Sequence, residues 1–212
     1  FLEYTLAHPG ADSRGIRRFF TIASAPEEGQ VLLVTKFAPE KSSTFKKALD
    51  EMRIGDDVIA STVSGDFTLP SDVAQKLVFI AGGIGSTPYR SMTKHLLARG
   101  EHRDIVLLYA VRTEKDLVFR NLFEGAETLG MRAVYILSEA DKAPADWSGR
   151  IGRLDADMIR AEVPDANERT FYISGPEPMV EALSKMLLET GIPDRQIRCD
   201  YFPGYTADGI LS

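Results

Sequence analysis

The chain has 212 residues, of which 44% are hydrophobic and 26% are charged, and its formal net charge is −6. This length allows one large or two small globular domains, and the acidic balance argues against a broad nucleic-acid interface, which needs a basic surplus to neutralise phosphates. Because Cys199 is the only cysteine, the chain by itself cannot form a disulfide, a cysteine zinc site or a thiolate iron–sulfur cluster.

The hydropathy pattern predicts no transmembrane segment. No apolar run approaches the roughly 20 residues that span a bilayer, and the lone cysteine fits a reducing compartment. We therefore expect a monomeric cytoplasmic protein, or the cytosolic module of a larger or membrane-associated one.

The first third of the chain predicts short β-strands. Four stretches are rich in β-branched or aromatic residues and are separated by turn sequences: FLEYTL, RRFFTIA, QVLLVTKF and DVIASTV. They predict an antiparallel sheet or a small barrel. Because the alternating pattern already runs at Phe1, we expect an earlier strand to precede it.

One helix is predicted within this region. Ser43 or Thr44 is its N-cap, and Phe45, Leu49 and Met52 lie along one face before the RIGDD turn. The crowded hydroxyl groups at its start suit a diphosphate. Capping alone explains them equally well.

Beyond residue 70 the pattern changes to buried strands that alternate with amphipathic helices. The predicted strands are KLVFIA, DIVLLYAV, RAVYILS and RTFYIS, and QIRCDYF is expected to add another. Helical stretches follow the first, second and fourth of them, and residues 139–153 predict a long loop. This alternation is typical of an α/β domain with a parallel sheet.

A glycine-rich turn, AGGIGSTP at residues 81–88, stands between the first of these strands and its helix. Gly82, Gly83 and Gly85 allow a diphosphate to approach the backbone, while Thr87 and Pro88 open a helix whose first amides favour anions. The turn departs from the common dinucleotide fingerprint because Pro88 takes the place of the third glycine. A tight turn without a ligand is the alternative.

A second motif is RRFFTIAS at residues 17–24. We expect Arg18, Phe20 and Thr21 to line one side of a strand, with Ile22 beside them. A guanidinium, an aromatic ring and a hydroxyl together suit the phosphate, ring and polar edge of a flavin. An ordinary amphipathic strand is the alternative.

A third motif, ISGPEPM at residues 173–179, joins a strand to a helix. The strand stops at Ser174, Gly175 and Pro176 form the turn, and Met179 lies in the first turn of the helix. Strand ends of this kind line the ligand crevice of open α/β sheets.

Taken in this order, these motifs resemble the ferredoxin-NADP reductase superfamily over nearly the whole chain. The resemblance implies an antiparallel β-barrel that binds a flavin, residues 1–72 with its first strand missing, followed by an α/β parallel-sheet domain that binds a nicotinamide dinucleotide, residues 73–212. It also implies a flavin-dependent oxidoreductase that passes a hydride from NADH or NADPH to the flavin.

The resemblance assigns roles in the flavin half. Arg18 would contact the flavin phosphates, Phe20 would stack on the isoalloxazine where the family more often has tyrosine, and Thr21 would stand near N5. Ser43 and Thr44 would hold a second phosphate, which favours FAD over FMN.

In the second half, the resemblance assigns the nicotinamide dinucleotide to two segments. One is the glycine turn with Gly82, Gly83, Gly85, Thr87 and Pro88, and the other contains Gly175, Pro176 and Met179. Ser174 occupies a position that is usually cysteine, next to the reacting nicotinamide carbon. Near the end of the chain, Phe202 or Tyr205 would cover the far face of the flavin, and we favour Phe202.

The choice between NADH and NADPH depends on the loop after RAVYILS. Ser138 and Glu139 stand there, and an acidic group would accept hydrogen bonds from ribose hydroxyls and repel a 2′-phosphate. Arg112 and Lys115 argue mildly for the phosphate. We expect NADH to be slightly favoured.

No metal is expected, and the acceptor of the electrons is expected to be a redox protein or fused domain outside this chain. A second class of function also fits the pattern: a flavin- or nucleotide-binding regulatory module without turnover, which Ser174 and the missing first strand favour.

Overall fold

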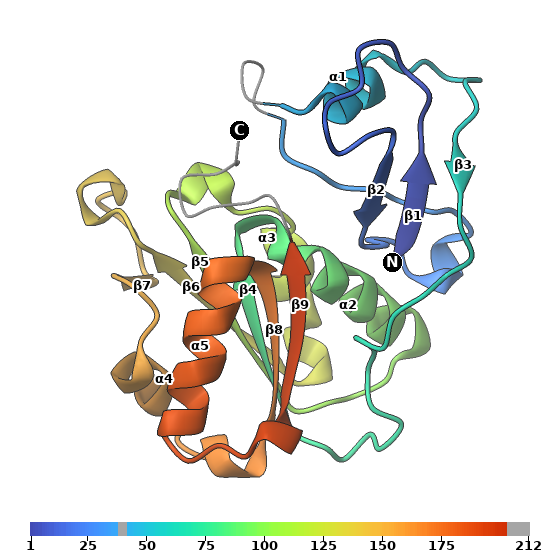
Figure 1. Ribbon diagram of the computed structural model, residues 1–212. Coiled ribbons are helices and arrows are strands. Elements are labelled where there is room, and N and C mark those ends of the chain that lie inside the picture. The colour runs from blue at the N-terminus through green and yellow to red at the C-terminus, as the bar shows by residue number, and fades with distance from the viewer. Residues whose placement is uncertain (38–41, 203–212) are drawn as a thin grey trace.

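The computed structural model describes residues 1–37 and 42–202 of the chain. Two sheets are present (Figure 1). The first is antiparallel, in the order β2-β1-β3, with strands Leu2–Thr5 (β1), Arg17–Phe20 (β2) and Ile59–Ala60 (β3). The second is parallel, in the order β7-β6-β5-β4-β8-β9, with strands Leu77–Gly82 (β4), Ile105–Val111 (β5), Met131–Leu137 (β6), Arg150–Ile151 (β7), Thr170–Pro176 (β8) and Ile197–Phe202 (β9).

Five α-helices and several short 3-10 helices connect these strands in the described part of the chain. The α-helices are Thr44–Glu51 (α1), Thr87–Arg99 (α2), Arg120–Gly125 (α3), Ala156–Glu162 (α4) and Glu177–Glu189 (α5). The 3-10 helices used below are Pro26–Glu28 (η1), Gly83–Ser86 (η2), Glu114–Asp116 (η3), Ala126–Leu129 (η4) and Ala140–Lys142 (η5). We call residues 1–60 the N-terminal unit and residues 77–202 the α/β unit.

The N-terminal unit is an open sheet with one helix, and a closed barrel is absent from the described residues. The predicted strand QVLLVTKF forms only one bridge, between Ile22 and Leu33, and DVIASTV contributes only β3. A β-prone sequence becomes a strand only where a neighbouring strand accepts its backbone hydrogen bonds. The predicted helix is confirmed as α1, with the Ser43 side chain accepting a hydrogen bond from the Lys46 amide as N-cap.

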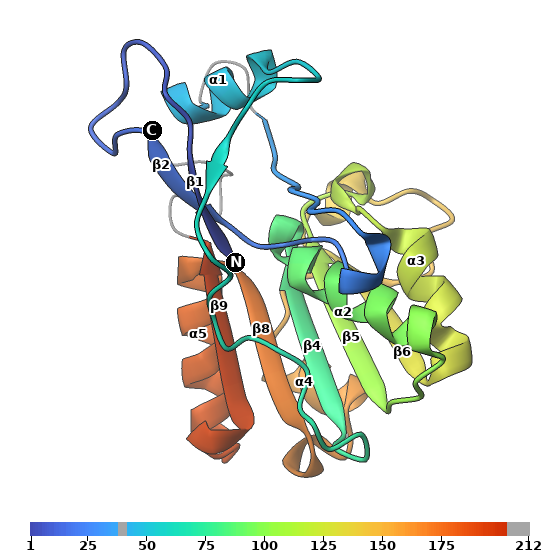
Figure 2. The same ribbon diagram turned by 90° about the vertical axis from the view of Figure 1, so that its right-hand side faces the viewer.

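The parallel sheet of the α/β unit is covered on both faces, as the sequence predicts. Helices α2 and α3 cover one face of the sheet and α4 and α5 the other (Figure 2). Successive residues of β4 point to opposite sides, so that Phe79 enters the cluster under α2 and α3 while Ile80 enters the cluster under α4 and α5. All six residues of β4 are buried. The sheet therefore forms the rigid centre of the molecule.

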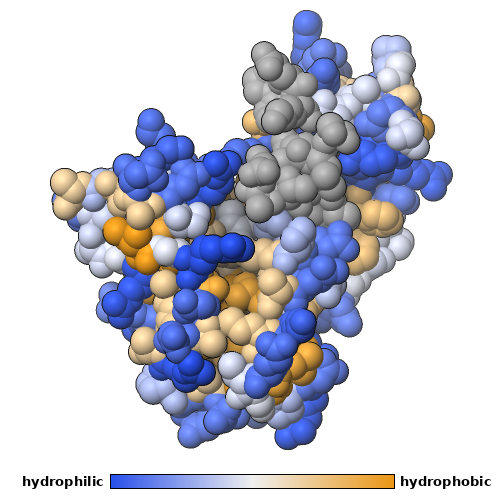
Figure 3. Space-filling model, turned by 60° about the vertical axis from the view of Figure 1, so that its left-hand side comes forward, coloured by the Kyte–Doolittle hydropathy of each residue, from blue (hydrophilic) through white to orange (hydrophobic). Residues whose placement is uncertain are grey.

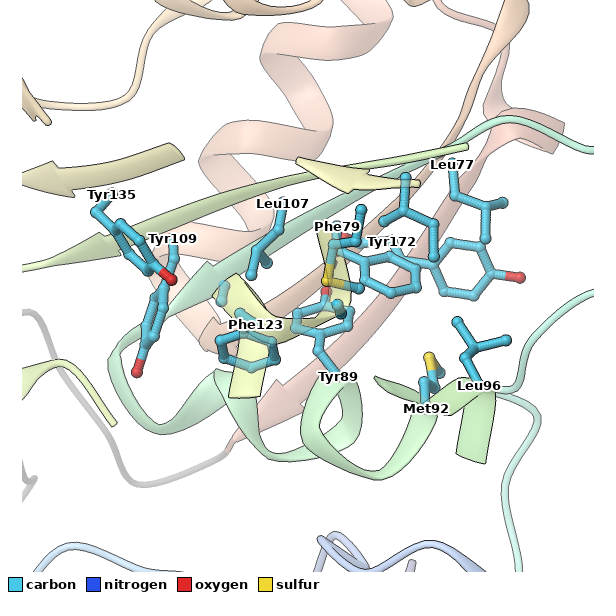
Figure 4. Close-up of a cluster of buried hydrophobic side chains, with 14 of the residues drawn as sticks. Leu77, Phe79, Tyr89, Met92, Leu96, Leu107, Tyr109, Phe123, Tyr135 and Tyr172 are labelled. Atoms are coloured by element: carbon cyan, nitrogen blue, oxygen red, sulfur yellow. Dashed lines mark hydrogen bonds between the residues drawn. The ribbon is translucent and has the colours of Figure 1, made fainter. Parts of the chain in front are cut away.

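Aromatic rings hold the start of α2 against the sheet (Figure 4). The rings of Phe79 and Tyr89 stack with centroids 4.6 Å apart. The Tyr89 hydroxyl donates hydrogen bonds to the carbonyl oxygens of Ile80, at 3.0 Å, and Tyr172, at 2.8 Å. Tyr89 is fully buried, and burial raises the pKa of its hydroxyl well above the ordinary value. The helix that follows the glycine turn is thus fixed to two adjacent strands.

The predicted helix over residues 113–130 is broken into three pieces, η3, α3 and η4. Phe119 interrupts it because this residue has a φ of 61° and precedes α3 as its N-cap. The sequence prediction also misses α4, which Asp155 caps by accepting a hydrogen bond from the Met158 amide at 2.8 Å. The long loop at 139–153 contains η5 and the short strand β7.

The N-terminal unit lies beyond the carboxyl end of β9 (Figures 1 and 2). On the face shown in Figure 3, hydrophilic residues separate the apolar areas of the surface. Throughout residues 1–37 and 42–202, no helix has the length and apolar character needed to cross a membrane.

Candidate functional site

The glycine turn joins the buried strand β4 to helix α2, as the sequence predicts. Gly83 has a φ of 53°, a left-handed conformation that glycine adopts at little cost. A Cβ atom on Gly85 would overlap the carbonyl oxygen of Ser174. This turn therefore packs directly against the end of β8.

The end of β8 brings the predicted motif ISGPEPM to the same place. Ser174 is fully buried, and β8 continues through Gly175 to Pro176 instead of stopping at Ser174. The Met179 sulfur lies where a Cβ atom on Gly82 would fall. Two motifs that are about 90 residues apart in the sequence thus form one surface at the carboxyl edge of the sheet.

The start of α2 has the properties of an anion site. The Thr87 Oγ1 atom is buried and has no hydrogen-bond partner among the described residues. Thr87 is the first residue of a 13-residue helix; its amide donates to the Ile84 carbonyl and Pro88 has no amide hydrogen, so the hydroxyl of Thr87 is the group left without a partner here, as far as the structure describes the chain. A buried polar group without a partner is costly, and a diphosphate oxygen near this turn would satisfy it.

The predicted motif RRFFTIAS is divided between two surfaces, which corrects the expectation that Arg18, Phe20 and Thr21 share one side of a strand. Arg18 and Phe20 lie on the face of β2 that packs against α1. The centroids of the Phe20 and Phe45 rings are 5.9 Å apart. The Arg18 guanidinium carbon lies 5.5 Å from the centroid of the Phe45 ring. Strand β2 ends at Phe20, and adjacent residues point in opposite directions. Thr21 instead lines a cavity between the two units, and Ile22 both lines that cavity and packs with Phe20 against the cluster of Leu2, Tyr4 and Phe45.

Arg18 organises the loop in front of its own strand. Its Nη1 atom donates to the carbonyl oxygens of Arg14, Gly15 and Arg17, at 2.6–2.9 Å, and its Nη2 atom donates to Asp12 Oδ1 at 2.7 Å. The Nε atom is buried and has no partner in the part of the chain that the structure describes. This guanidinium still has a donor available for an anion.

The hydroxyls at the start of α1 already have partners. Ser43 Oγ caps the helix, as described above. Thr44 Oγ1 accepts from the Asp12 amide at 3.0 Å and is 2.9 Å from His8 Nε2. The capping alternative therefore accounts for both groups, and a phosphate here would compete with these hydrogen bonds.

A cavity of about 770 Å³ separates the two units. Thr21 and Ile22 line it from the N-terminal unit, Pro88 and Asp200 line it from the α/β unit, and Phe67 lines it from the segment that connects them. Its volume is within the usual range of ligand sites, roughly 300–1,000 Å³.

Asp200 is a cavity residue that the sequence analysis missed. It stands opposite Ser174 in the register of β8 and β9, and Ser174 Oγ donates to its Oδ2 atom at 3.4 Å. Burial raises the pKa of the Asp200 carboxyl above its ordinary value, against the opposing effect of hydrogen bonds from Ser174 and Thr21. An acidic residue inside the strand-like stretch QIRCDYF was the available signal, since few strands bury a carboxyl group.

The loop after β6 carries an ion-paired carboxylate. Ser138 continues the edge of the sheet by donating its amide to the Val111 carbonyl at 2.9 Å. Glu139 accepts hydrogen bonds at 2.5 Å from both Lys142 Nζ and Arg112 Nε. The Lys142 and Arg112 cations lower the pKa of Glu139, so its negative charge is already compensated.

The last predicted residues are only partly described. The backbone of Phe202 pairs with Pro176 at the end of β9, and Tyr205 lies outside the described residues. Within the described ranges, no group of three or more His, Cys, Asp or Glu side chains is arranged to hold a metal ion.

Comparison with known proteins places the second half of the chain in a family. Residues 79–185 match the family model described as the oxidoreductase NAD-binding domain. The glycine betaine monooxygenase reductase subunit of Chromohalobacter salexigens is 24% identical over 199 residues, which cover 93% of this chain and 54% of that protein. The stachydrine N-demethylase reductase subunit of Rhizobium meliloti is 27% identical over 213 residues, which cover 98% of this chain and 59% of that protein.

Solved structures extend the likeness to both units. The Amycolatopsis cytochrome P450 reductase GcoB superimposes with a TM-score of 0.77 at 31% identity, covering 95% of this chain and 60% of that one. The ferredoxin NADP+ reductase of Neisseria gonorrhoeae shares the fold, with a TM-score of 0.72 at 19% identity over 95% of this chain and 85% of that one. The chain spans between half and three-fifths of the curated relatives described above.

Proposed function

Because this chain belongs to the oxidoreductase NAD-binding domain family, within the ferredoxin-NADP reductase superfamily that its motifs resemble, we propose that it takes a hydride from a reduced nicotinamide dinucleotide and delivers the electrons through a flavin to an acceptor. The observation that carries the proposal is the cavity between the two units. Thr21 lies on one wall, and Pro88 and Asp200 lie on the other, so two cofactors bound by the two units would meet there.

The residues at the carboxyl edge of the sheet are proposed to hold the dinucleotide. The unpartnered Thr87 hydroxyl binds its diphosphate at the start of α2. Gly83 leaves open space beside the turn, while Gly82 and Gly85 let the turn pack against Met179 and Ser174. Gly175, Pro176 and Met179 form the floor beneath the nicotinamide. These groups bind and orient the dinucleotide, and no acid–base triad is required of the protein.

The N-terminal unit is proposed to hold FAD, with the sheet β2-β1-β3 as part of a flavin-binding barrel. The unpartnered Nε atom of Arg18 supports a phosphate contact, and Phe20 and Ile22 supply apolar surface on either side of Thr21. Bound flavin accepts a hydride and can release electrons singly. To stack on the flavin, Phe20 must be released from the Phe45 ring that it now contacts.

Thr21, Ser174 and Asp200 are proposed to form the polar group nearest the reacting rings, and Phe202 is proposed to cover the flavin. Burial raises the pKa of the Asp200 carboxyl, which lines the cavity between the two units. Ser174 Oγ donates to that carboxyl and thereby orients it. The hydroxyl of Ser174 takes the place of the thiol that is usual in the superfamily.

We propose NADH as the preferred dinucleotide. Glu139, next to Ser138, accepts hydrogen bonds from the ribose hydroxyls and repels a 2′-phosphate. The Arg112 and Lys142 cations that pair with Glu139 weaken this repulsion but do not abolish it. Glu139→Gln should therefore raise kcat/KM for NADPH about tenfold relative to NADH, because the substitution removes the negative charge that repels a 2′-phosphate. An unchanged ratio of the two constants would contradict this assignment.

The electron acceptor is proposed to be a separate redox protein or a fused domain. The relatives named as reductase subunits of monooxygenase and demethylase systems support this. Oxidation of NADH with ferricyanide by a purified yellow protein tests the enzymatic function. A colourless protein that binds the dinucleotide without oxidising it would instead support a regulatory module, the alternative that Ser174 favours.

A further inference from the structure

Helix α2 contacts the N-terminal unit through Arg90, whose side chain is largely buried, and through the more exposed pair of His95 Nδ1 and Glu27 Oε1, 2.8 Å apart. Arg90 makes a bidentate ion pair with Glu28, from Nη1 to Oε2 at 2.8 Å and from Nη2 to Oε1 at 2.9 Å. The same Nη1 atom donates to the Ala23 carbonyl at 2.6 Å. Only 12% of the Arg90 side chain and 22% of the Glu28 side chain are exposed, so solvent screens this pair weakly.

The contact is supported on both sides. Glu28 Oε2 also accepts the Ala25 amide at 2.7 Å, which closes the loop of residues 23–28 on itself. Ala23, Ser24 and Ala25 are buried, and Ser91 Oγ donates to the Ser24 carbonyl at 2.7 Å. The Arg90 guanidinium is 5.5 Å from the Phe119 ring. One side chain thus joins the loop, the helix and the turn before α3.

The position of this contact connects the two proposed cofactor surfaces. Arg90 follows Thr87 by three residues, which places it about one turn along the same side of α2. On the other side of the contact, Ala23 follows Thr21 by two residues. The short path from Thr87 through Arg90 to Thr21 therefore joins the anion site of one unit to the cavity wall of the other.

We propose that Arg90 and Glu28 are positioning residues, which set the distance and angle between the flavin and the nicotinamide. This inference rests on the proposed function, because it assigns a role in that hydride transfer. Hydride transfer requires reacting atoms about 3–3.5 Å apart, and a misplacement of 1 Å can cost 10²-fold in rate. A bidentate pair with a third hydrogen bond holds an angle better than a single ionic contact does.

Another ion pair between the units provides a matched control. Lys36 Nζ is 2.8 Å from Asp116 Oδ1, and 56% of the lysine side chain is exposed. The aspartate side chain is 27% exposed, so the two pairs differ mainly in the cation, and a largely solvated lysine contributes little orientation. Lys36→Gln removes the same kind of charge from the same interface.

The test measures flavin reduction by NADH in a stopped-flow instrument, with the full chain loaded with FAD. For Arg90→Gln and Glu28→Gln we expect the limiting rate to fall at least tenfold, while flavin content and the Kd for NADH change less than twofold. Arg90→Lys, which keeps the charge and one donor, should give an intermediate rate, and Lys36→Gln should stay within twofold of wild type. Thermal melting of each variant separates a loss of folded protein from a loss of rate.

Three results would overturn the inference. If Arg90→Gln and Glu28→Gln reduce flavin at the wild-type rate, the contact does not position the cofactors, although the proposed function survives. If their rates fall only in proportion to the flavin-loaded fraction, the contact serves stability alone. If wild-type protein loaded with FAD is not reduced by NADH, the proposed function fails and this inference fails with it.

Discussion

At the scale of single residues, Asp200 is a cavity-lining carboxyl whose pKa is shifted by burial. Burial raises the pKa of its carboxyl, so the folded chain holds this proton more tightly than the unfolded chain does. The free energy of unfolding therefore falls as the pH rises above the pKa that Asp200 has in the unfolded chain. Once ionised, Asp200 destabilises the folded protein. Such a cost is typical of a site where function outweighs stability.

Asp200→Asn should consequently stabilise the fold while slowing flavin reduction. At pH 7 we expect the Tm to rise by roughly 2–4 °C, the shift for about 1 kcal/mol in a chain of this size. Near pH 3 the difference should vanish, because the carboxyl is then protonated in both states. Calorimetry at the two pH values checks this, with Asp157→Asn, whose side chain is 86% exposed, as the control. A lower Tm at pH 7 would contradict it.

Arg18 is the residue on which flavin retention is predicted to depend. Arg18→Ala removes four hydrogen bonds within the loop as well as the proposed phosphate contact. After dialysis, we expect the flavin-to-protein absorbance ratio to fall below about half of the wild-type value, since charged hydrogen bonds contribute about 1.5–3 kcal/mol. Arg17→Ala is the matched control, because the neighbouring arginine is 67% exposed. Equal flavin content in all three proteins would refute the assignment.

At the scale of elements, the junction between η2 and β8 depends on backbone contact. Gly85→Ala places a Cβ atom on the Ser174 carbonyl oxygen, which belongs to a central strand and cannot move aside. We expect a destabilisation of about 3 kcal/mol and a loss of dinucleotide affinity. Urea unfolding and NADH titration measure the two effects.

Gly125→Ala is the control for that substitution. Gly125 lies at the end of α3 with a φ of −63°, and nothing lies within 4 Å of the Cβ position. Alanine there should stabilise the chain by about 0.4–1 kcal/mol. If both alanine variants were equally stable, the steric argument for Gly85 would be wrong.

At the scale of the whole molecule, the Arg90–Glu28 contact also makes the union of the two units sensitive to acid. The hydrogen bonds from Arg90, assisted by the Ala25 amide, lower the pKa of Glu28 from 4.5 to about 2. Because the pKa of Glu28 is lower in the folded chain than in the unfolded chain, its ionised carboxylate stabilises the fold. This stabilisation is complete at a pH above the unfolded pKa and is lost as the pH falls toward about 2.

Glu28→Gln should therefore be less stable than wild type at pH 7, by about 1.5–3 kcal/mol, and the gap should close between about pH 5 and pH 2. Asp165→Asn is the comparison within the α/β unit, since Arg169 holds the pKa of Asp165 at about 2 as well. It should lose stability over the same pH range without slowing hydride transfer. A pH-independent gap for Glu28→Gln would contradict the linkage.

The sequence by itself determined the central strands of the α/β half and two of its helices. Periodicity identified β4, β5, β6 and β8, and it indicated α2 and α5, because strands buried on both faces and amphipathic helices leave distinct local patterns. The glycine turn was also predictable, because strand, glycines and helix start follow one another directly in the chain.

Only the tertiary structure decided which of these groups meet. Asp200 joins Ser174 through the pairing of two strands, and Arg90 reaches Glu28 across 62 residues. The small sheet was overpredicted for the same reason, since QVLLVTKF has the propensity of a strand but pairs only at Leu33. The local hydropathy pattern indicates whether a residue is buried. Which residue it contacts depends on the packing of segments that are far apart in the chain.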